Sequence, residues 1–133
     1  RKHLSGWKDR DGEVFYTPAG AMHGPKVMLI DQDAGSGGDY LPYSFRDLGI
    51  GKLMGTRTWG GLIGIATNPR LMDGGYLTVT FFRFFDTENR WSLENEGVAP
   101  DIEVEHDPIA SNQGRDSQLE QAIVEVLSLL EGF

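Results

Sequence analysis

The chain has 133 residues and a formal net charge of −8, and hydrophobic residues make up 39% of it. This content is enough for a folded core, and we expect residues 1–133 to form a single domain. The acidic balance argues against non-specific nucleic-acid binding, which needs clustered cations. The chain has no cysteine, which excludes disulfides and thiol catalysis. No apolar run approaches the roughly 20 residues of a membrane span, so we expect no membrane partner.

The first residue is Arg1 rather than Met, which indicates a fragment or a processed product. A targeting signal outside this sequence would then be invisible. We expect a cytoplasmic location, and a periplasmic one stays open because this start is not the native one.

The first half of the chain predicts a strand, a helix and a second strand. Residues 1–24 are polar and broken, with one short strand predicted over 13–17. The apolar, β-branched run at 25–30 predicts a buried strand. A helix is predicted next, because apolar residues recur at helical spacing and a glycine suits its end (Leu41, Phe45, Leu48, Gly49). Residues 51–55 predict a strand that returns parallel to the first through a right-handed crossover.

The second half predicts further strands and one long helix. Residues 77–85 are β-branched and aromatic without a breaker and give the clearest strand pattern. A turn at 86–89 and a short return strand at 90–93 follow, and 102–105 alternates like an edge strand. Gly114 and Asp116 open an amphipathic helix whose apolar residues share one face (Leu119, Ile123, Val126, Leu127, Leu130). The order of elements predicts an α/β fold.

The stretch between the first strand and the first helix carries the main candidate chemistry. Gly35-Ser36-Gly37-Gly38 places a serine hydroxyl where a strand ends and free helix N–H groups begin. A nucleophile beside oxyanion donors needs this geometry. An ordinary flexible loop and a phosphate cradle have the same local pattern and stay open. Tyr40 occupies the position of the third glycine in a dinucleotide fingerprint, and Ala34 breaks the lipase-type Gly-x-Ser-x-Gly elbow.

No general base for Ser36 can be assigned within the chain. His23 precedes the first strand, and about seven extended residues place it roughly 20 Å from the serine. His3 and His106 lie in polar segments without a partner at a suitable spacing. No histidines share ligand spacing and the acidic residues are scattered, so no metal and no cofactor are expected.

Four blocks of sequence resemble one family when they are taken together. Residues 35–39, 48–61, 94–104 and 114–119 are similar, in this order, to the tricorn protease branch of the tail-specific (C-terminal processing) serine peptidases. The resemblance runs from about residue 25 to 128. It implies a crotonase/ClpP-like α/β core with a mixed, mainly parallel sheet, of which this chain is the C-terminal portion.

The resemblance implies a Ser-His-Ser-Glu tetrad whose histidine lies on an upstream part of the same polypeptide. Ser36 matches the nucleophile, the N–H of Gly37 matches half of the oxyanion hole, and Glu94 matches the family's glutamate, with Glu96 as its competitor. Tricorn itself has aspartate at the position of Gly37. The segment that lines the cleft and pairs with extended substrate matches Arg57, Thr58, Trp59, Gly60 and Gly61, which otherwise read as a simple β-turn.

The implied function is hydrolysis of peptide bonds in an oligopeptide or an exposed chain terminus, with a homo-oligomer as one form of the assembly. The isolated chain is expected to be inactive, because the base histidine and the second oxyanion donor are missing from it. Two other classes stay open. One is a catalytically silent relative that binds peptides or apolar ligands in the same cleft, and the other is a phosphate-binding α/β domain.

Overall fold

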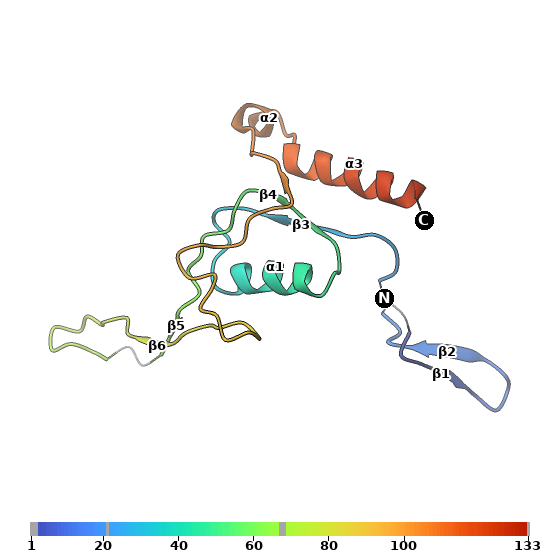
Figure 1. The fold of residues 1–133 in the computed structure, drawn as a ribbon, viewed down its shortest axis with the longest axis horizontal. Coiled ribbons are helices and arrows are strands. Elements are labelled where there is room, and N and C mark those ends of the chain that lie inside the picture. Colours follow the sequence, from blue (N-terminus) through green and yellow to red (C-terminus); the bar gives the residue numbers. More distant parts are fainter. Residues whose placement is uncertain (1–2, 21, 67–68, 133) are drawn as a thin grey trace.

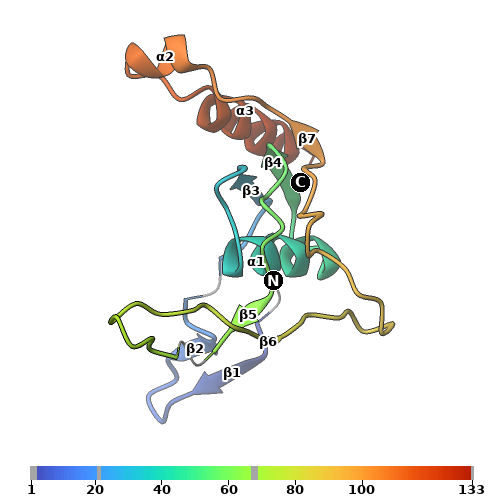
Figure 2. The ribbon, with the colours of Figure 1, turned by 90° about the vertical axis from the view of Figure 1, so that its left-hand side faces the viewer.

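A three-stranded parallel sheet forms the centre of the computed structural model, which describes residues 3–20, 22–66 and 69–132. Its strands are β3 (Val27–Ile30), β4 (Lys52–Gly55) and β7 (Ile102–Glu103), in the order β3-β4-β7 (Figures 1 and 2; β7 is labelled in Figure 2). These are the strands predicted over 25–30, 51–55 and 102–105, each shorter than its apolar pattern. The last of them lies at a sheet edge, as its alternating pattern indicated.

One helix lies on each side of this sheet, and the α/β class expected from the sequence is therefore observed. Helix α1 (Gly37–Asp47) places Tyr43 and Phe45 against a buried cluster that includes Ile30 and Leu53. Helix α3 (Ser117–Glu131) packs on the opposite face of β3 (Figure 1). Because successive residues of a strand face opposite sides, the short β3 supplies apolar contacts to both helices.

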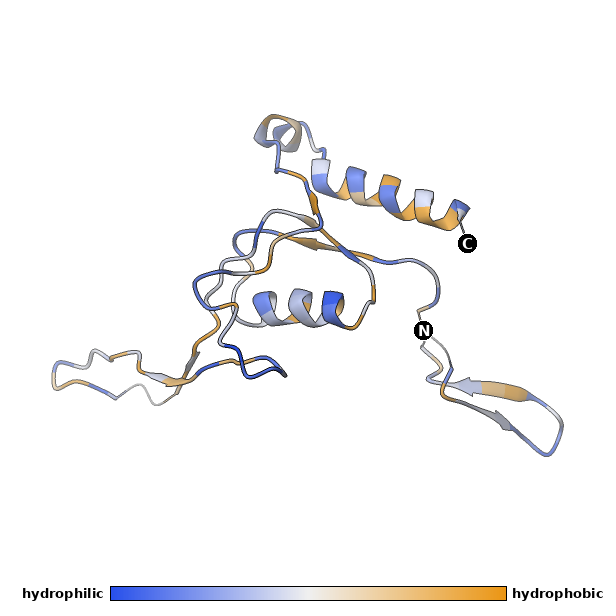
Figure 3. Ribbon diagram, in the orientation of Figure 1, coloured by the Kyte–Doolittle hydropathy of each residue, from blue (hydrophilic) through white to orange (hydrophobic). Residues whose placement is uncertain are grey.

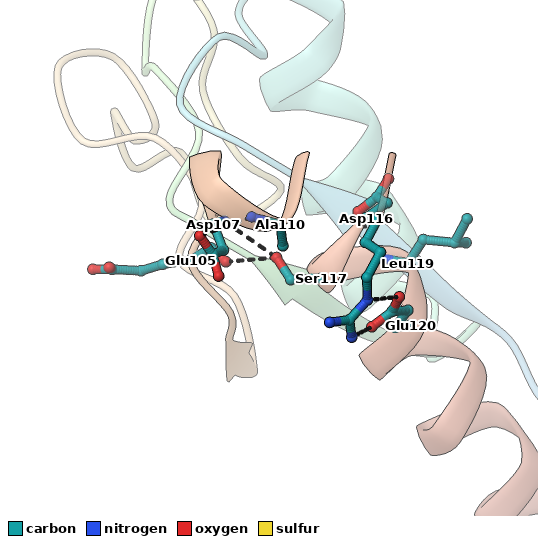
Figure 4. A network of polar contacts seen from close by, with 8 residues as sticks. Glu105, Asp107, Ala110, Asp116, Ser117, Leu119 and Glu120 are labelled. Carbon is teal, nitrogen blue, oxygen red and sulfur yellow. Dashed lines mark hydrogen bonds and ion pairs between the residues drawn. The ribbon is translucent and has the colours of Figure 1, made fainter. Parts of the chain in front are cut away.

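Side-chain caps fix the start of the C-terminal helices. Asp116 caps α3 by accepting from the Leu119 amide at 2.9 Å, so the predicted N-terminus of this helix is confirmed. A short helix that the sequence did not predict, α2 (Pro108–Asn112), precedes it and is capped by Asp107. The Ser117 hydroxyl accepts from the Asp107 amide and donates to the Glu105 carbonyl, which ties the two helix starts together (Figure 4).

Two hairpins extend away from the sheet (Figures 1 and 2). Strands β1 (Ser5–Lys8) and β2 (Val14–Thr17) pair antiparallel near the N-terminus. The predicted strand at 13–17 is confirmed, whereas its partner β1 was hidden in a polar, broken sequence. The second hairpin pairs β5 (Gly64–Ile65) with β6 (Thr80–Phe82). The structure as a whole therefore contains both parallel and antiparallel pairing.

The long strand predicted over 77–85 is wrong in its extent, and the return strand at 90–93 is absent from the described structure. Only Thr80–Phe82 forms a strand, opposite the two residues of β5, and the side chains of Phe81 and Phe82 are 71% and 61% exposed. High β-propensity without a neighbouring strand does not extend a sheet. After it, Asp86 accepts from the amides of Glu88 and Arg90, so a local turn uses groups that a return strand would need.

The edge of β3 opposite β4 is open in the described part of the chain. The Ile30 carbonyl accepts from the Thr56 amide on the β4 side, so the backbone groups of Leu29 point the other way. Next to this edge, Leu29 and the apolar face of α3 line a groove of roughly 300 Å³. Ile123 and Leu127 in it are 51% and 55% exposed. Figure 3 shows hydrophobic residues recurring along α3. The predicted apolar face is thus only partly covered. Among the described residues, no helix has the length and apolar character to cross a membrane.

Candidate active site

Ser36 lies at a strained turn between β3 and α1. Its backbone has φ 54° and ψ −107°, a conformation that non-glycine residues rarely adopt. The helix begins at Gly37, and Ser36 is its N-cap residue, so the serine lies at the boundary between strand and helix as predicted. Its side chain is exposed, and within the described residues its hydroxyl has no hydrogen-bond partner. The turn therefore presents a free hydroxyl at the end of the central sheet.

The amide of Gly37 is the free N–H group at this helix start. The amides of Ser36, Gly38 and Asp39 donate to the carbonyls of Gly61, Gly35 and Ser36, at 3.0, 2.7 and 3.0 Å. That of Gly37 donates to no atom in residues 3–20, 22–66 or 69–132. An unused N–H at the positive end of a helix dipole favours a negative oxygen beside it. A free hydroxyl and a free helix-start amide therefore lie on adjacent residues, and these are two of the groups that oxyanion stabilisation uses.

The segment predicted to bind substrate is joined to the serine turn by backbone hydrogen bonds. The Trp59 amide donates to the Ala34 carbonyl at 2.9 Å, and the Thr58 amide donates to the Val98 carbonyl at 3.1 Å. The Gly60 amide donates to the Asp39 carboxylate. With these three amides in use, an extended substrate would have to pair with other backbone groups of the cleft.

Glu94 is held by the chain that follows this segment. One of its carboxylate oxygens, Oε2, accepts from the amides of Leu62 and Ile63, at 2.7 Å each. The residues on either side, Leu93 and Asn95, have positive φ angles of 71° and 62°. A strained turn and two amide donors therefore fix a half-buried carboxylate. Its sequence competitor, Glu96, is exposed.

Two cavities meet at Ser36. The larger, about 790 Å³, is lined by Ser36, Trp59, Gly60, Gly61 and Glu94 among others, so the structure brings these predicted residues together. Arg57 and Thr58 do not line it: Thr58 is buried, and Arg57 donates to the Glu96 carbonyl. Their part in binding substrate stays a prediction.

The smaller cavity, about 430 Å³, also touches Gly37 and is mainly apolar. Its walls include side chains that the sequence did not mark as site residues (Tyr40, Leu62, Phe82, Phe84). Phe82 and Phe84 lie within the run predicted as one strand. Because that run is only partly buried, these two side chains can line the cavity. A run of aromatic residues alone does not separate a pocket wall from a core strand.

No histidine is among the residues that line either cavity. The His23 ring lies 4.8 Å from the His3 ring, which stacks on Tyr16 of the β1–β2 hairpin. His106 is exposed next to α2. The described residues thus offer no histidine at the serine, and they contain no group of three or more side chains arranged to hold a metal ion.

A parallel sheet that ends in a strained serine beside an unused helix-start amide is the arrangement found at the nucleophile of serine hydrolases. Comparison with known families agrees with this class. The family model described as "Peptidase family S41" matches residues 5–104, and the chain belongs to this family.

Tricorn proteases are among its similar relatives. That of Thermoplasma volcanium is 39% identical over 132 residues, which cover 99% of this chain and 13% of the relative. Tricorn protease homolog 1 of Streptomyces coelicolor is 42% identical over 114 residues, covering 86% of this chain and 11% of the relative. A crystal structure of the tricorn protease superposes with a TM-score of 0.84 at 37% identity, over 98% of this chain and 13% of that one. The resemblance seen in the sequence is confirmed, and the chain spans only about an eighth of these proteins.

Proposed function

We propose that the protein containing this chain is a serine peptidase that hydrolyses peptide bonds with Ser36 as its nucleophile. The observation that carries the proposal is the exposed Ser36 hydroxyl, held at a strained turn beside the unused Gly37 amide. Membership of a peptidase family supports it. The relatives named tricorn protease support a peptide as the substrate.

In the proposed reaction, Ser36 Oγ attacks the carbonyl carbon of the scissile bond as its proton passes to a general base. The carbonyl oxygen becomes an oxyanion and accepts a hydrogen bond from the Gly37 N–H. The carbon–nitrogen bond then breaks, the base returns the proton to the leaving amine, and an acyl-enzyme remains. Water attacks this ester through the same base and releases the acid. Each donor aimed at the oxyanion contributes about 3–4 kcal/mol of transition-state stabilisation in well-studied cases.

The base in this proposal is a histidine on an upstream segment of the same polypeptide. Glu94 orients it through an intervening serine, using the carboxylate that two backbone amides already hold. The open edge of β3 and the groove beside α3 support an incomplete unit, because native proteins usually cover such edges. We propose that upstream strands complete a crotonase/ClpP-like core there, and that the protein works in a larger assembly.

A fluorophosphonate probe on the full-length protein tests the proposal, since it labels only an activated serine. We expect labelling of the wild type and of Ser111→Ala, a control in the exposed part of α2, and none of Ser36→Ala. Equal labelling of Ser36→Ala would overturn the assignment of the nucleophile. A folded wild type that takes up no probe would instead support a silent peptide-binding relative. Strong labelling of residues 1–133 alone would contradict an upstream base.

A further inference from the structure

Asp39, three residues after Ser36, is a fully buried acid with contacts outside its own helix. Its side chain is 0% exposed. Oδ1 accepts from the Thr58 hydroxyl at 2.6 Å and from the Gly60 amide at 2.8 Å. Oδ2 is buried without a partner in the described part of the chain. Burying a carboxylate is costly unless it is well hydrogen-bonded, so a carboxylate here calls for a reason.

The contacts of Asp39 differ from those of a helix cap. Asp107 and Asp116 accept from the amides of the helices that they begin. Asp39 also lies in the first turn of a helix, yet both hydrogen bonds that its side chain accepts from the described residues come from another segment, at Thr58 and Gly60. A side chain used only to start α1 would satisfy α1 amides. The bonds of Asp39 instead join the serine turn to residues 58–60, of which Trp59 and Gly60 line the larger cavity at Ser36.

A third segment is attached through the same two residues. The Thr58 hydroxyl accepts from the Val98 amide at 2.7 Å, and the Gly60 carbonyl accepts from the Asn95 amide at 2.7 Å. Val98 and Asn95 belong to the loop that carries Glu94. The Asp39 side chain is therefore part of one network that connects the serine turn, residues 58–60 and the loop that carries Glu94.

We propose that Asp39 is a positioning residue for acyl transfer, which holds Ser36 and Gly37 at the distance from residues 58–60 that the reaction needs. This role rests on the proposed peptidase function. Reacting groups must be held within about 0.5 Å of their productive geometry. A displacement of about 1 Å costs on the order of 100-fold in rate. Without the Asp39 bonds, only the backbone bonds from Trp59 to Ala34 and from Ser36 to Gly61 hold the start of α1 against this segment among the residues that the structure describes. We expect a small shift of the serine turn, which alters the rate of attack more than the affinity for substrate.

The test compares variants of the full-length protein by the rate constant of fluorophosphonate labelling, by kcat and KM on a peptide, and by the urea midpoint. Asp39→Ala is expected to slow labelling at least about tenfold and to lower kcat, with KM within about threefold. Asp39→Asn keeps an acceptor oxygen of the same shape and is expected to restore most of the rate. Adding Thr58→Val to Asp39→Ala is expected to cost less than the two single losses combined, because both changes remove the bond between Thr58 and Asp39.

Asp86→Asn is the matched control, since Asp86 is a buried acid that accepts amides within its own loop. It is expected to lower the urea midpoint and leave the labelling rate unchanged. If Asp39→Ala does not fold, Thr58→Val alone decides: slowed labelling supports the role and an unchanged rate overturns it. If the probe labels Asp39→Ala as fast as it labels the wild type, the positioning role alone is overturned. A wild type that takes up no probe overturns the peptidase function and this role with it.

Discussion

Replacing Gly97 by alanine is expected to destabilise the protein far more than the same change at Gly114. Both glycines have positive φ, 64° and 78°, so alanine carries a similar conformational cost at each, about 1–2 kcal/mol. A Cβ at Gly114 meets nothing within 4 Å, whereas a Cβ at Gly97 would lie 2.1 Å from the Thr58 carbonyl oxygen. The two variants therefore separate backbone conformation from close approach.

The additional cost at Gly97 follows from the contacts that have to move. Relieving the clash shifts Thr58 away and weakens its two bonds to Val98, the amide-to-carbonyl bond of 3.1 Å and the hydroxyl bond of 2.7 Å. Each is worth about 1 kcal/mol, and a buried group left unpaired costs about 1–3 kcal/mol. We expect a total of about 3–5 kcal/mol for Gly97→Ala and about 1–2 kcal/mol for Gly114→Ala.

Urea unfolding followed by far-ultraviolet circular dichroism gives both free energies of unfolding. Equal m-values of the two variants would show that both expose a similar surface on unfolding, so that their free energies can be compared. If the two variants lose the same stability within about 0.5 kcal/mol, the close approach of Gly97 to Thr58 does not constrain the fold, and the reasoning is refuted.

Three further changes have defined outcomes. Gly37→Ala is expected to alter the labelling rate by less than about threefold, because the amide is retained and a Cβ there meets nothing within 4 Å; a large loss would show that the side-chain position matters. Asp86 has its pKa lowered, chiefly because the Arg90 amide donates to it, so its stabilisation is present above the unfolded pKa of about 4 and is lost as pH falls through the folded value. Asp86→Asn should flatten that acid dependence of the urea midpoint, and an unchanged slope would contradict it. Leu53→Ala, at a fully buried core position, should cost about 2–5 kcal/mol in urea unfolding, and a loss below about 1 kcal/mol would place Leu53 outside the core.

Local signals in the sequence were sufficient for the elements that position the serine. The apolar run that forms β3, the glycine-flanked Ser36 and the Asp116 cap depend on neighbours within a few residues, and the structure has all three. The glycine-flanked serine also marked where α1 begins, although the two glycines at the start of this helix carry no apolar periodicity.

Features that depend on distant residues were not predictable. The strand pattern of 77–85 was strong, but its pairing was set by the two residues available in β5. The position of Asp39 gave no sign of its bonds to Thr58 and Gly60, which come from 19 and 21 residues away. Glu94 was singled out by a family resemblance, because the amides that hold its carboxylate lie 32 and 31 residues earlier.

The free side of β3 has a practical consequence for anyone who produces this stretch by itself. Main-chain donors and acceptors without a partner among the described residues, next to the apolar groove beside α3, form a template on which identical molecules can pair edge to edge. Self-association during purification would then reflect this uncovered edge rather than a misfolded core. A charged residue in place of Leu127, which lines that groove, is the direct way to suppress the self-association.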